Sequence, residues 1–184
     1  MSSDRLVKGN QSFTSKILEQ DPIFFENLKT GQSPEYFVIS CSDSRVSPSV
    51  ISESPLGTMF VHRNIANQVR ENDESLTSSL YYALAHLKVK KVIIKGHTEC
   101  GGVAAAKAGN EEPYLKSWIG GIKEGFTNQG HSTEDDLNEL VKANVKAQVE
   151  QMRQHPVYKE YGKDTEVEGY LFHLGSGKLE KLDV

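Results

Sequence analysis

The stretch Tyr36-Phe37-Val38-Ile39-Ser40-Cys41-Ser42-Asp43-Ser44-Arg45 sets the architecture of this 184-residue chain. Its first half is aromatic and β-branched, a composition typical of a strand buried inside a sheet. A cysteine, an aspartate and an arginine follow directly. Because the binding sites of open α/β sheets form beyond the carboxyl ends of the strands, the stretch predicts a central strand with a functional site at its end.

Strand-like and helix-like segments alternate along the rest of the chain. Short β-branched or apolar runs predict strands over 58–62, 91–95, 166–174 and 179–182. Apolar residues at helical intervals predict helices within 4–30, 74–87 and 137–152. This alternation favours a mostly parallel sheet flanked by helices. We expect a single α/β domain over 1–184, in which 1–30 form an N-terminal helical arm.

Capping and breaking residues predict where several helices begin and end. One helix is expected to start after Asn72 or Asp73, since either side chain can cap it. The pair Gly120-Gly121 is expected to interrupt a short helix, and 125–130 to form a polar loop. The sequence Ser132-Thr133-Glu134-Asp135 resembles the capped start of the long helix that follows.

The composition excludes several classes of protein. The chain is 37% hydrophobic and 25% charged, with a formal net charge of -4, as expected of a folded globular protein. It has no basic block, so we expect no nucleic-acid partner. Its apolar stretches are too short to cross a membrane. The first residues lack the order of a secretory signal, which predicts a cytoplasmic protein with reduced thiols.

The two cysteines of the chain predict a zinc site. Cys41 follows the first strand, and Cys100 follows His97 at the spacing His-x-x-Cys. Catalytic zinc typically has three protein ligands and one open position, and Asp43 is the nearest candidate for the fourth position. A disulfide and two inert buried thiols are the alternatives. Reducing conditions disfavour the disulfide, and inert thiols leave the spacing unexplained.

Three motifs together resemble those of the β-class carbonic anhydrases. They are Cys-Ser-Asp-Ser-Arg at 41–45, His-Arg-Asn-Ile-Ala-Asn at 62–67 and Gly-His-Thr-Glu-Cys-Gly-Gly at 96–102. The resemblance extends roughly over 31–118. It implies a four-stranded parallel core sheet, flanked by helices and extended by a further C-terminal strand. It also implies self-association as a homodimer or a dimer of dimers.

The resemblance also assigns site residues by position. It implies one zinc ion per subunit held by Cys41, His97 and Cys100, and a dyad of Asp43 and Arg45 beside it. The residues expected to line the substrate pocket are Gln32, Phe60, Ile65, Tyr82 and Gly101. Part of this lining comes from the partner subunit in the family, so Gln32 and Tyr82 are candidates for the neighbour's site. A surface ion pair for the dyad, and ordinary core packing for Phe60 and Ile65, stay open as alternatives.

The implied reaction is the reversible hydration of CO₂ to bicarbonate and a proton by zinc-bound hydroxide. Two thiolates cancel the charge of the ion, so we expect hydroxide to form at a relatively high pH and activity to rise with pH. Family members with an inhibitory bicarbonate site have Trp and Tyr at two positions where this chain has Val38 and Phe172. We therefore expect no inhibitory bicarbonate site here. We also expect the fourth coordination position of the zinc to be open at neutral pH.

Other functions share the predicted ligand set. Alcohol dehydrogenases also use two cysteines and a histidine, but this chain lacks the Gly-x-Gly-x-x-Gly pattern of a dinucleotide site. A CS₂ or COS hydrolase on the same scaffold remains an alternative. A non-catalytic zinc or thiol sensor is a second one, and it would need no residue to orient hydroxide.

Overall fold

The computed structural model describes residues 3–184, and the chain divides into two compact units, Met1–Gln32 and Ser33–Val184. The first unit contains helices α1 (Ser3–Gln20) and α2 (Phe24–Leu28). Several of its apolar side chains stay exposed; Leu6, for example, is 74% exposed. This unit lies where the sequence predicts a helical arm. The assignment of 1–184 to a single domain stays a prediction.

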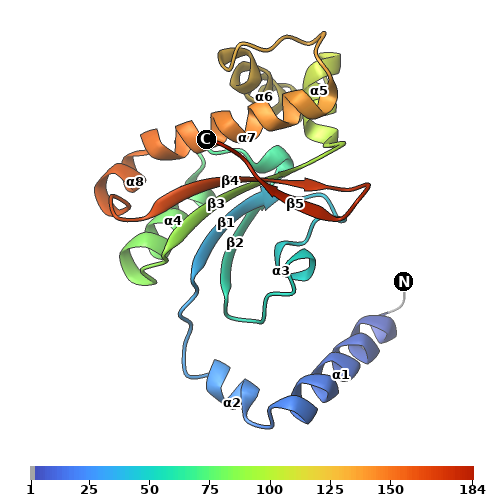
Figure 1. Cartoon of the computed structure of the whole chain (residues 1–184), viewed down its shortest axis with the longest axis vertical. Helices are drawn as coiled ribbons and strands as arrows, with labels where there is room; N and C mark the ends of the chain where they lie inside the picture. The colour runs from blue at the N-terminus through green and yellow to red at the C-terminus, as the bar shows by residue number, and fades with distance from the viewer. Residues whose placement is uncertain (1–2) are drawn as a thin grey trace. The chain divides into compact units, whose positions relative to one another are not determined.

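A five-stranded sheet forms the centre of the second unit (Figure 1). Its strands are β1 (Tyr36–Cys41), β2 (Met59–Asn64), β3 (Lys91–His97), β4 (Glu166–His173) and β5 (Lys178–Lys181). Their order across the sheet is β2-β1-β3-β4-β5, and only the β4–β5 pair is antiparallel. The predicted α/β fold is thereby confirmed, including the parallel core of four strands and its C-terminal extension.

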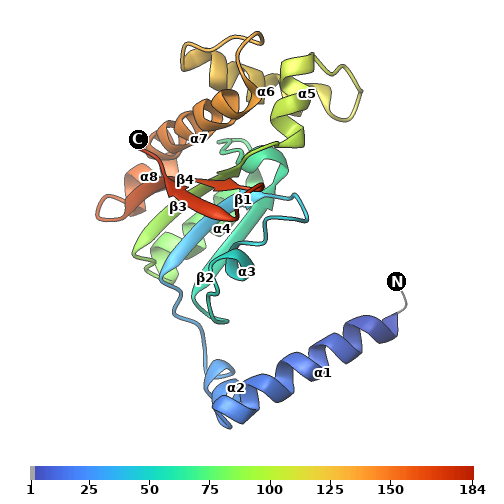
Figure 2. The same cartoon turned by 45° about the vertical axis from the view of Figure 1, so that its right-hand side comes forward.

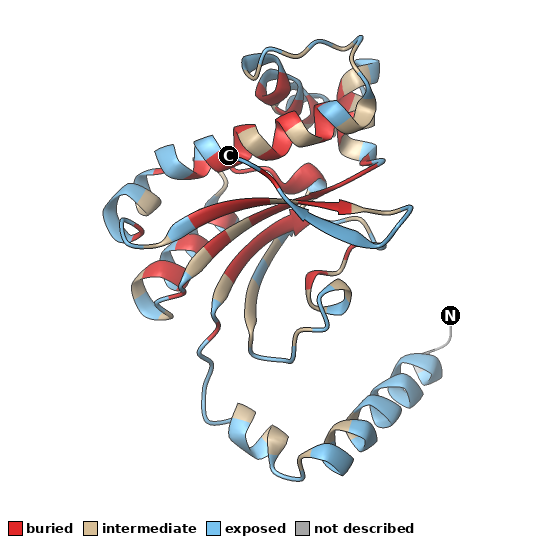
Figure 3. Ribbon diagram, viewed as in Figure 1, coloured by how far each residue is buried: buried red, intermediate tan, exposed pale blue. Residues whose placement is uncertain are grey.

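Helix α7 (Leu137–Gln154) packs along β3 and β4 and supplies much of the core (Figures 1 and 3). Two glycines permit this contact. A Cβ atom at Gly96 would lie 2.5 Å from Val145 Cγ2, and one at Gly169 would lie 3.1 Å from Val145 Cγ1. Helix α7 can therefore pack directly against β3, the interior strand that ends at His97.

The remaining helices are short and surround this centre. Helices α5 (Gly101–Ala108) and α6 (Lys116–Asn128) pack against each other and against α7 (Figure 2). The other elements are α3 (Pro48–Ile51), the 3-10 turn η1 (Ile65–Asn67), α4 (Glu74–Tyr81), the π-turn η2 (Tyr82–His86) and α8 (Pro156–Tyr161). Among the described residues, no helix combines the length and the apolar character needed to cross a bilayer.

Several helix boundaries differ from the sequence expectation. Helix α6 runs unbroken through Gly120 and Gly121 and continues to Asn128, so the predicted interruption and most of the predicted loop are wrong. A Cβ atom at Gly121 would lie 2.5 Å from Arg70 Nη2, so this glycine lies inside the helix at a point of close approach to the Arg70 side chain and does not break it. Helix α7 starts at Leu137, after the capped start expected at 132–135, because Asp136 caps it. The predicted cap at Asp73 is correct: its side chain accepts a hydrogen bond from Leu76 N.

Candidate metal centre

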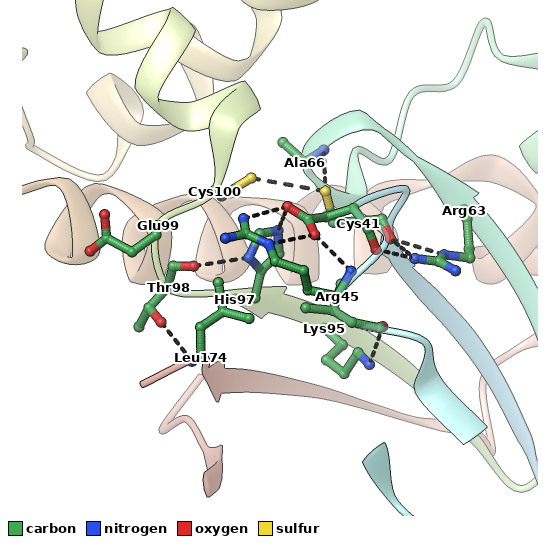
Figure 4. A network of polar contacts seen from close by, with 12 residues as sticks. Cys41, Arg45, Arg63, Ala66, Lys95, His97, Thr98, Glu99, Cys100 and Leu174 are labelled. Atoms are coloured by element: carbon green, nitrogen blue, oxygen red, sulfur yellow. Dashed lines mark hydrogen bonds and ion pairs between the residues drawn. The ribbon is translucent and has the colours of Figure 1, made fainter. Parts of the chain in front are cut away.

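The parallel sheet brings the two cysteine motifs together. Cys41 is the last residue of β1, His97 is the last residue of β3, and these strands are direct neighbours. Cys100 follows as the N-cap of α5. The two sulfur atoms lie 4.0 Å apart, and the ligand atoms of all three buried residues lie within 4.8 Å of one another (Figure 4). Neither cysteine is in a disulfide.

The histidine is oriented as a metal ligand would be. Its Nδ1 lies 2.9 Å from the Thr98 carbonyl oxygen, which can only accept, so Nδ1 carries the proton. In a neutral ring this leaves a lone pair on Nε2, and that atom is buried without a hydrogen-bond partner. Buried polar atoms are normally satisfied. A metal ion at Nε2 would satisfy this one, with the Nδ1 bond fixing the tautomer.

The thiols are electrostatically coupled. Hydrogen bonding to Cys100 lowers the pKa of the Cys41 thiol, and burial opposes this effect without cancelling it. The Cys41 sulfur and burial raise the pKa of Cys100. Without a cation, one negative charge is therefore shared between two sulfurs. A divalent ion would allow both to ionise, because metal binding displaces thiol protons.

Zinc fits this donor set. It binds thiolate sulfur at about 2.3 Å, so two sulfurs up to about 4.6 Å apart can share one ion. The observed separation of 4.0 Å lies within that limit. Two thiolates and an imidazole are also the soft and borderline donors that zinc prefers over magnesium or calcium. Cys41, His97 and Cys100 can hold zinc without a change of fold.

Asp43 lies beside the three ligands and is held by Arg45. Arg45 donates from Nε to Asp43 Oδ1 at 2.9 Å and from Nη2 to Oδ2 at 2.7 Å. Its backbone N–H also donates to Oδ1, at 2.9 Å. These bonds hold the pKa of Asp43 well below its usual range. Asp43 Oδ2 is 3.9 Å from His97 Nε2, so an ionised carboxylate borders the site.

The residues expected to line the pocket fall into three places. Phe60 on β2 and Tyr82 on η2 have ring centroids 5.9 Å apart. Ile65 is 39% exposed and lies close to the first turn of α5, which Gly101 begins directly after Cys100. Gln32 belongs to the N-terminal unit and is exposed. The structure thus pairs Phe60 with Tyr82 and brings Ile65 to the helix that starts at the metal ligands.

Three groups that sequence reasoning did not place at the site bind its backbone or the Cys41 sulfur. Arg63 donates to the Cys41 carbonyl oxygen at 2.9 and 2.7 Å and to the Asp43 carbonyl oxygen at 2.7 Å (Figure 4). The Ala66 N–H donates to Cys41 Sγ at 3.4 Å. Trp118 Nε1 donates to the Ile65 carbonyl oxygen at 2.9 Å. The motif at 62–67 contains the first two of these groups, but the sequence alone does not show that Arg63 donates to backbone carbonyl oxygens and Ala66 to the Cys41 sulfur.

A cavity of considerable volume lies elsewhere in the second unit. It encloses about 720 Å³ between the segment after η1, α6 and the end of α7. None of the three candidate ligands lines it. The grouping of metal-binding side chains therefore identifies the candidate site better than cavity volume does.

Comparisons with known proteins agree with this geometry. A family profile described as carbonic anhydrase matches residues 36–179. A carbonic anhydrase of Emericella nidulans is 37% identical over 191 residues, covering 98% of this chain and 83% of that protein. A tetrameric β-carbonic anhydrase of Sordaria macrospora superposes with a TM-score of 0.90 at 32% identity, covering 98% and 96% of the two chains. A β-carbonic anhydrase of Aspergillus fumigatus gives a TM-score of 0.88 at 34% identity, covering 98% and 90%.

Proposed function

The chain belongs to the β-class carbonic anhydrases, and from this premise we propose that it hydrates CO₂ reversibly to bicarbonate and a proton with one zinc ion per subunit. The observation that carries the zinc proposal is the buried cluster of Cys41, His97 and Cys100. Their two sulfurs and one unpartnered nitrogen form a donor set suited to zinc. When bound, zinc supplies a Lewis acid that makes water a better nucleophile.

Asp43 is proposed to orient the nucleophile. The bidentate bond from Arg45 keeps the carboxylate ionised, so Asp43 can only accept hydrogen bonds. A water or hydroxide beside it would donate its hydrogen to Asp43 and direct a lone pair toward CO₂. Arg45 also restrains the carboxylate from becoming a fourth ligand. The dyad therefore supports turnover and argues against a purely structural or sensory metal site.

The substrate slot is proposed to be small and largely apolar. Phe60, Ile65 and Tyr82 offer apolar surface suited to uncharged CO₂. The Gly101 N–H lies at the start of a helix, where backbone donors are free to bind a bicarbonate oxygen. We propose the same polar role for Gln32, in the site of the neighbouring subunit.

Self-association is proposed through the N-terminal unit. Leu6, Val7 and Phe13 are 74%, 57% and 42% exposed in the single chain. An amphipathic helix with such a surface gains free energy by burying it against another chain. The Sordaria macrospora relative is tetrameric. We propose a homodimer or a dimer of dimers, working in the cytoplasm.

Stopped-flow CO₂ hydration, with zinc measured on the same sample, tests the function. We expect about one zinc per chain and fast hydration in the wild type, and loss of both in Cys41→Ala. Parallel assays with COS and CS₂ test the hydrolase alternative. Zinc bound at full occupancy without hydration of any of these substrates would favour a sensor. Folded wild-type protein that never binds zinc would overturn the proposal.

A further inference from the structure

Two adjacent residues after β2 have an unfavourable backbone conformation. Ala66 has φ 60° and ψ 31°, and Asn67 has φ 49°. Non-glycine residues rarely adopt this left-handed region, because their Cβ atom crowds the backbone. Surrounding contacts must therefore hold the turn in place. The turn matters at the metal centre, since it directs the Ala66 N–H at Cys41 Sγ (Figure 4).

Two amide side chains of α7 hold this turn from one side. Asn144 Nδ2 donates to the Ala66 carbonyl oxygen at 3.1 Å, and Gln148 Oε1 accepts from Val69 N at 2.7 Å. Both side chains are buried, with 1% and 0% exposure. They lie one helical turn apart within the apolar face of α7. Burying two amides there costs free energy unless they bind something specific.

Gln68 joins these side chains into a network. Its Nε2 donates to the Ala66 carbonyl oxygen at 2.9 Å and to Asn144 Oδ1 at 2.8 Å. Gln148 Nε2 lies 3.4 Å from the same Asn144 oxygen. We call Gln68, Asn144 and Gln148 the amide clamp. Because its members bind one another as well as the turn, they fix it more firmly than separate bonds would.

The turn is held from the other side as well. Trp118 Nε1 donates to the Ile65 carbonyl oxygen, which belongs to the same peptide group as the Ala66 N–H. This bond polarises the peptide and strengthens the N–H as a donor to sulfur. Gly102 permits the close packing: a Cβ atom there would lie 2.6 Å from Ile65 Cγ2. The peptide between Ile65 and Ala66 is therefore fixed at both of its polar atoms.

We propose that Asn144 and Gln148 are positioning residues of the metal centre, which hold the left-handed turn so that the Ala66 N–H is hydrogen-bonded to the Cys41 sulfur. The inference rests on the proposed function, because it takes Cys41 as a zinc ligand. Hydrogen bonds from neighbouring groups to a metal ligand orient that ligand and withdraw charge from it. Neither amide touches substrate or metal. Their effect reaches the site through one backbone peptide.

The test compares variants along one helix. Asn144→Leu removes the bond to Ala66, and Gln148→Met removes the bond to Val69 while nearly conserving volume. Gln151→Leu is the matched control, because Gln151 is an exposed amide on the same helix. Zinc affinity is measured by chelator competition. The thiolate-to-metal charge-transfer band is measured after cobalt substitution, and folding is followed by circular dichroism.

We expect each clamp variant to bind zinc about 10- to 100-fold more weakly than the wild type. Its cobalt band should move to longer wavelength, because a sulfur without the N–H bond gives up an electron more easily. Gln151→Leu should match the wild type in zinc affinity and in the position of the cobalt band. A general loss of stability would lower the melting temperature but would not move the band of the folded fraction.

The outcomes separate this inference from the proposed function. Wild-type protein that binds neither zinc nor cobalt through sulfur would overturn both. Normal metal binding by the wild type, with unchanged affinity and band position in the folded clamp variants, would overturn the positioning role alone. If Asn144→Leu does not fold, the milder Gln148→Met decides the question by the same two measurements.

Discussion

Arg45 and Asp43 form a bidentate pair at the boundary between the buried ligands and solvent. Nε to Oδ1 is 2.9 Å and Nη2 to Oδ2 is 2.7 Å, while the side chains are 54% and 18% exposed. An ion pair this exposed contributes little to stability. Its geometry, in contrast, fixes both oxygens of a carboxylate that stands 3.9 Å from His97 Nε2. This geometry fits the proposed role of the pair in orienting the nucleophile.

Replacing Arg45 with lysine should lower activity without releasing zinc. Lysine keeps the positive charge but has no planar fork, so it cannot hold both oxygens of Asp43. We expect kcat/KM for CO₂ to fall about 10- to 100-fold, the usual effect of losing a residue that orients site groups. Stopped-flow kinetics and zinc content of the same sample check this. Wild-type kcat/KM in a zinc-loaded Arg45→Lys variant would show that the bidentate contact is dispensable.

Removing zinc should destabilise the protein. Without the ion, His97 Nε2 is buried and unpartnered, and the two sulfurs share one negative charge. A ligand that binds only the folded state raises its stability. We expect a strong chelator to lower the melting temperature of the wild type and added zinc to restore it. Cys41→Ser serves as the control, because its melting temperature should not respond to the chelator.

The sequence was sufficient to predict the sheet and the cysteine cluster. Strands buried on both faces are nearly continuous apolar runs, and β1 and β3 have this character. Because parallel strands end at the same edge, Cys41 and His97 could be expected to meet. This reasoning needs only short-range sequence patterns and one general rule of sheet topology, so no knowledge of long-range contacts is required.

The supporting contacts could not be predicted in the same way. Ala66 acts through its backbone N–H, which every non-proline residue has, so its identity gives no signal. Asn144 and Gln148 interrupt an apolar face one helical turn apart, which signals buried polar partners but does not name them. Helix α6 continues through Gly120 and Gly121 and contacts Arg70, which lies about 50 residues earlier in the chain, so short-range patterns do not reveal this contact.

The two glycines of α6 should respond differently to alanine. Nothing lies within 4 Å of a Cβ atom at Gly120, whereas one at Gly121 would lie 2.5 Å from Arg70 Nη2. Gly120→Ala should stabilise the protein by about 0.5–1 kcal/mol, because alanine favours the helix and restricts the unfolded chain. Gly121→Ala should displace Arg70 from the Trp118 ring, which its guanidinium carbon approaches to 4.0 Å.

Melting temperatures of the two variants check this pair. Gly120→Ala should melt above the wild type and Gly121→Ala below Gly120→Ala. Equal increases in both variants would mean that Arg70 can move without cost, and the close approach would then not explain the second glycine.

Glu168 on β4 forms side-chain contacts with residues of β3 and β5. Lys91 on β3 and Lys181 on β5 each donate to its Oε1 at 2.7 Å, and Tyr170 donates to its Oε2 at 2.8 Å. Burial opposes ionisation of Glu168, but these hydrogen bonds outweigh it and lower its pKa to about 2. The Glu168 side chain is only 8% exposed, whereas the side chain of Glu166, which also lies on β4, is 71% exposed.

This contact should make stability depend on pH below about 5. An unfolded glutamate has a pKa of about 4.3, so the unfolded chain takes up the proton first as the pH falls. The stabilisation by Glu168, at most about 3 kcal/mol, is complete above that value and disappears as the pH approaches 2. The melting temperature of Glu168→Gln should therefore lie below that of the wild type at pH 6, and the gap should narrow at pH 3. Glu166→Gln is the matched control, because its exposed pair with Lys91 contributes little at either pH. A gap that stays constant between pH 6 and pH 3 would rule out Glu168 as the titrating group.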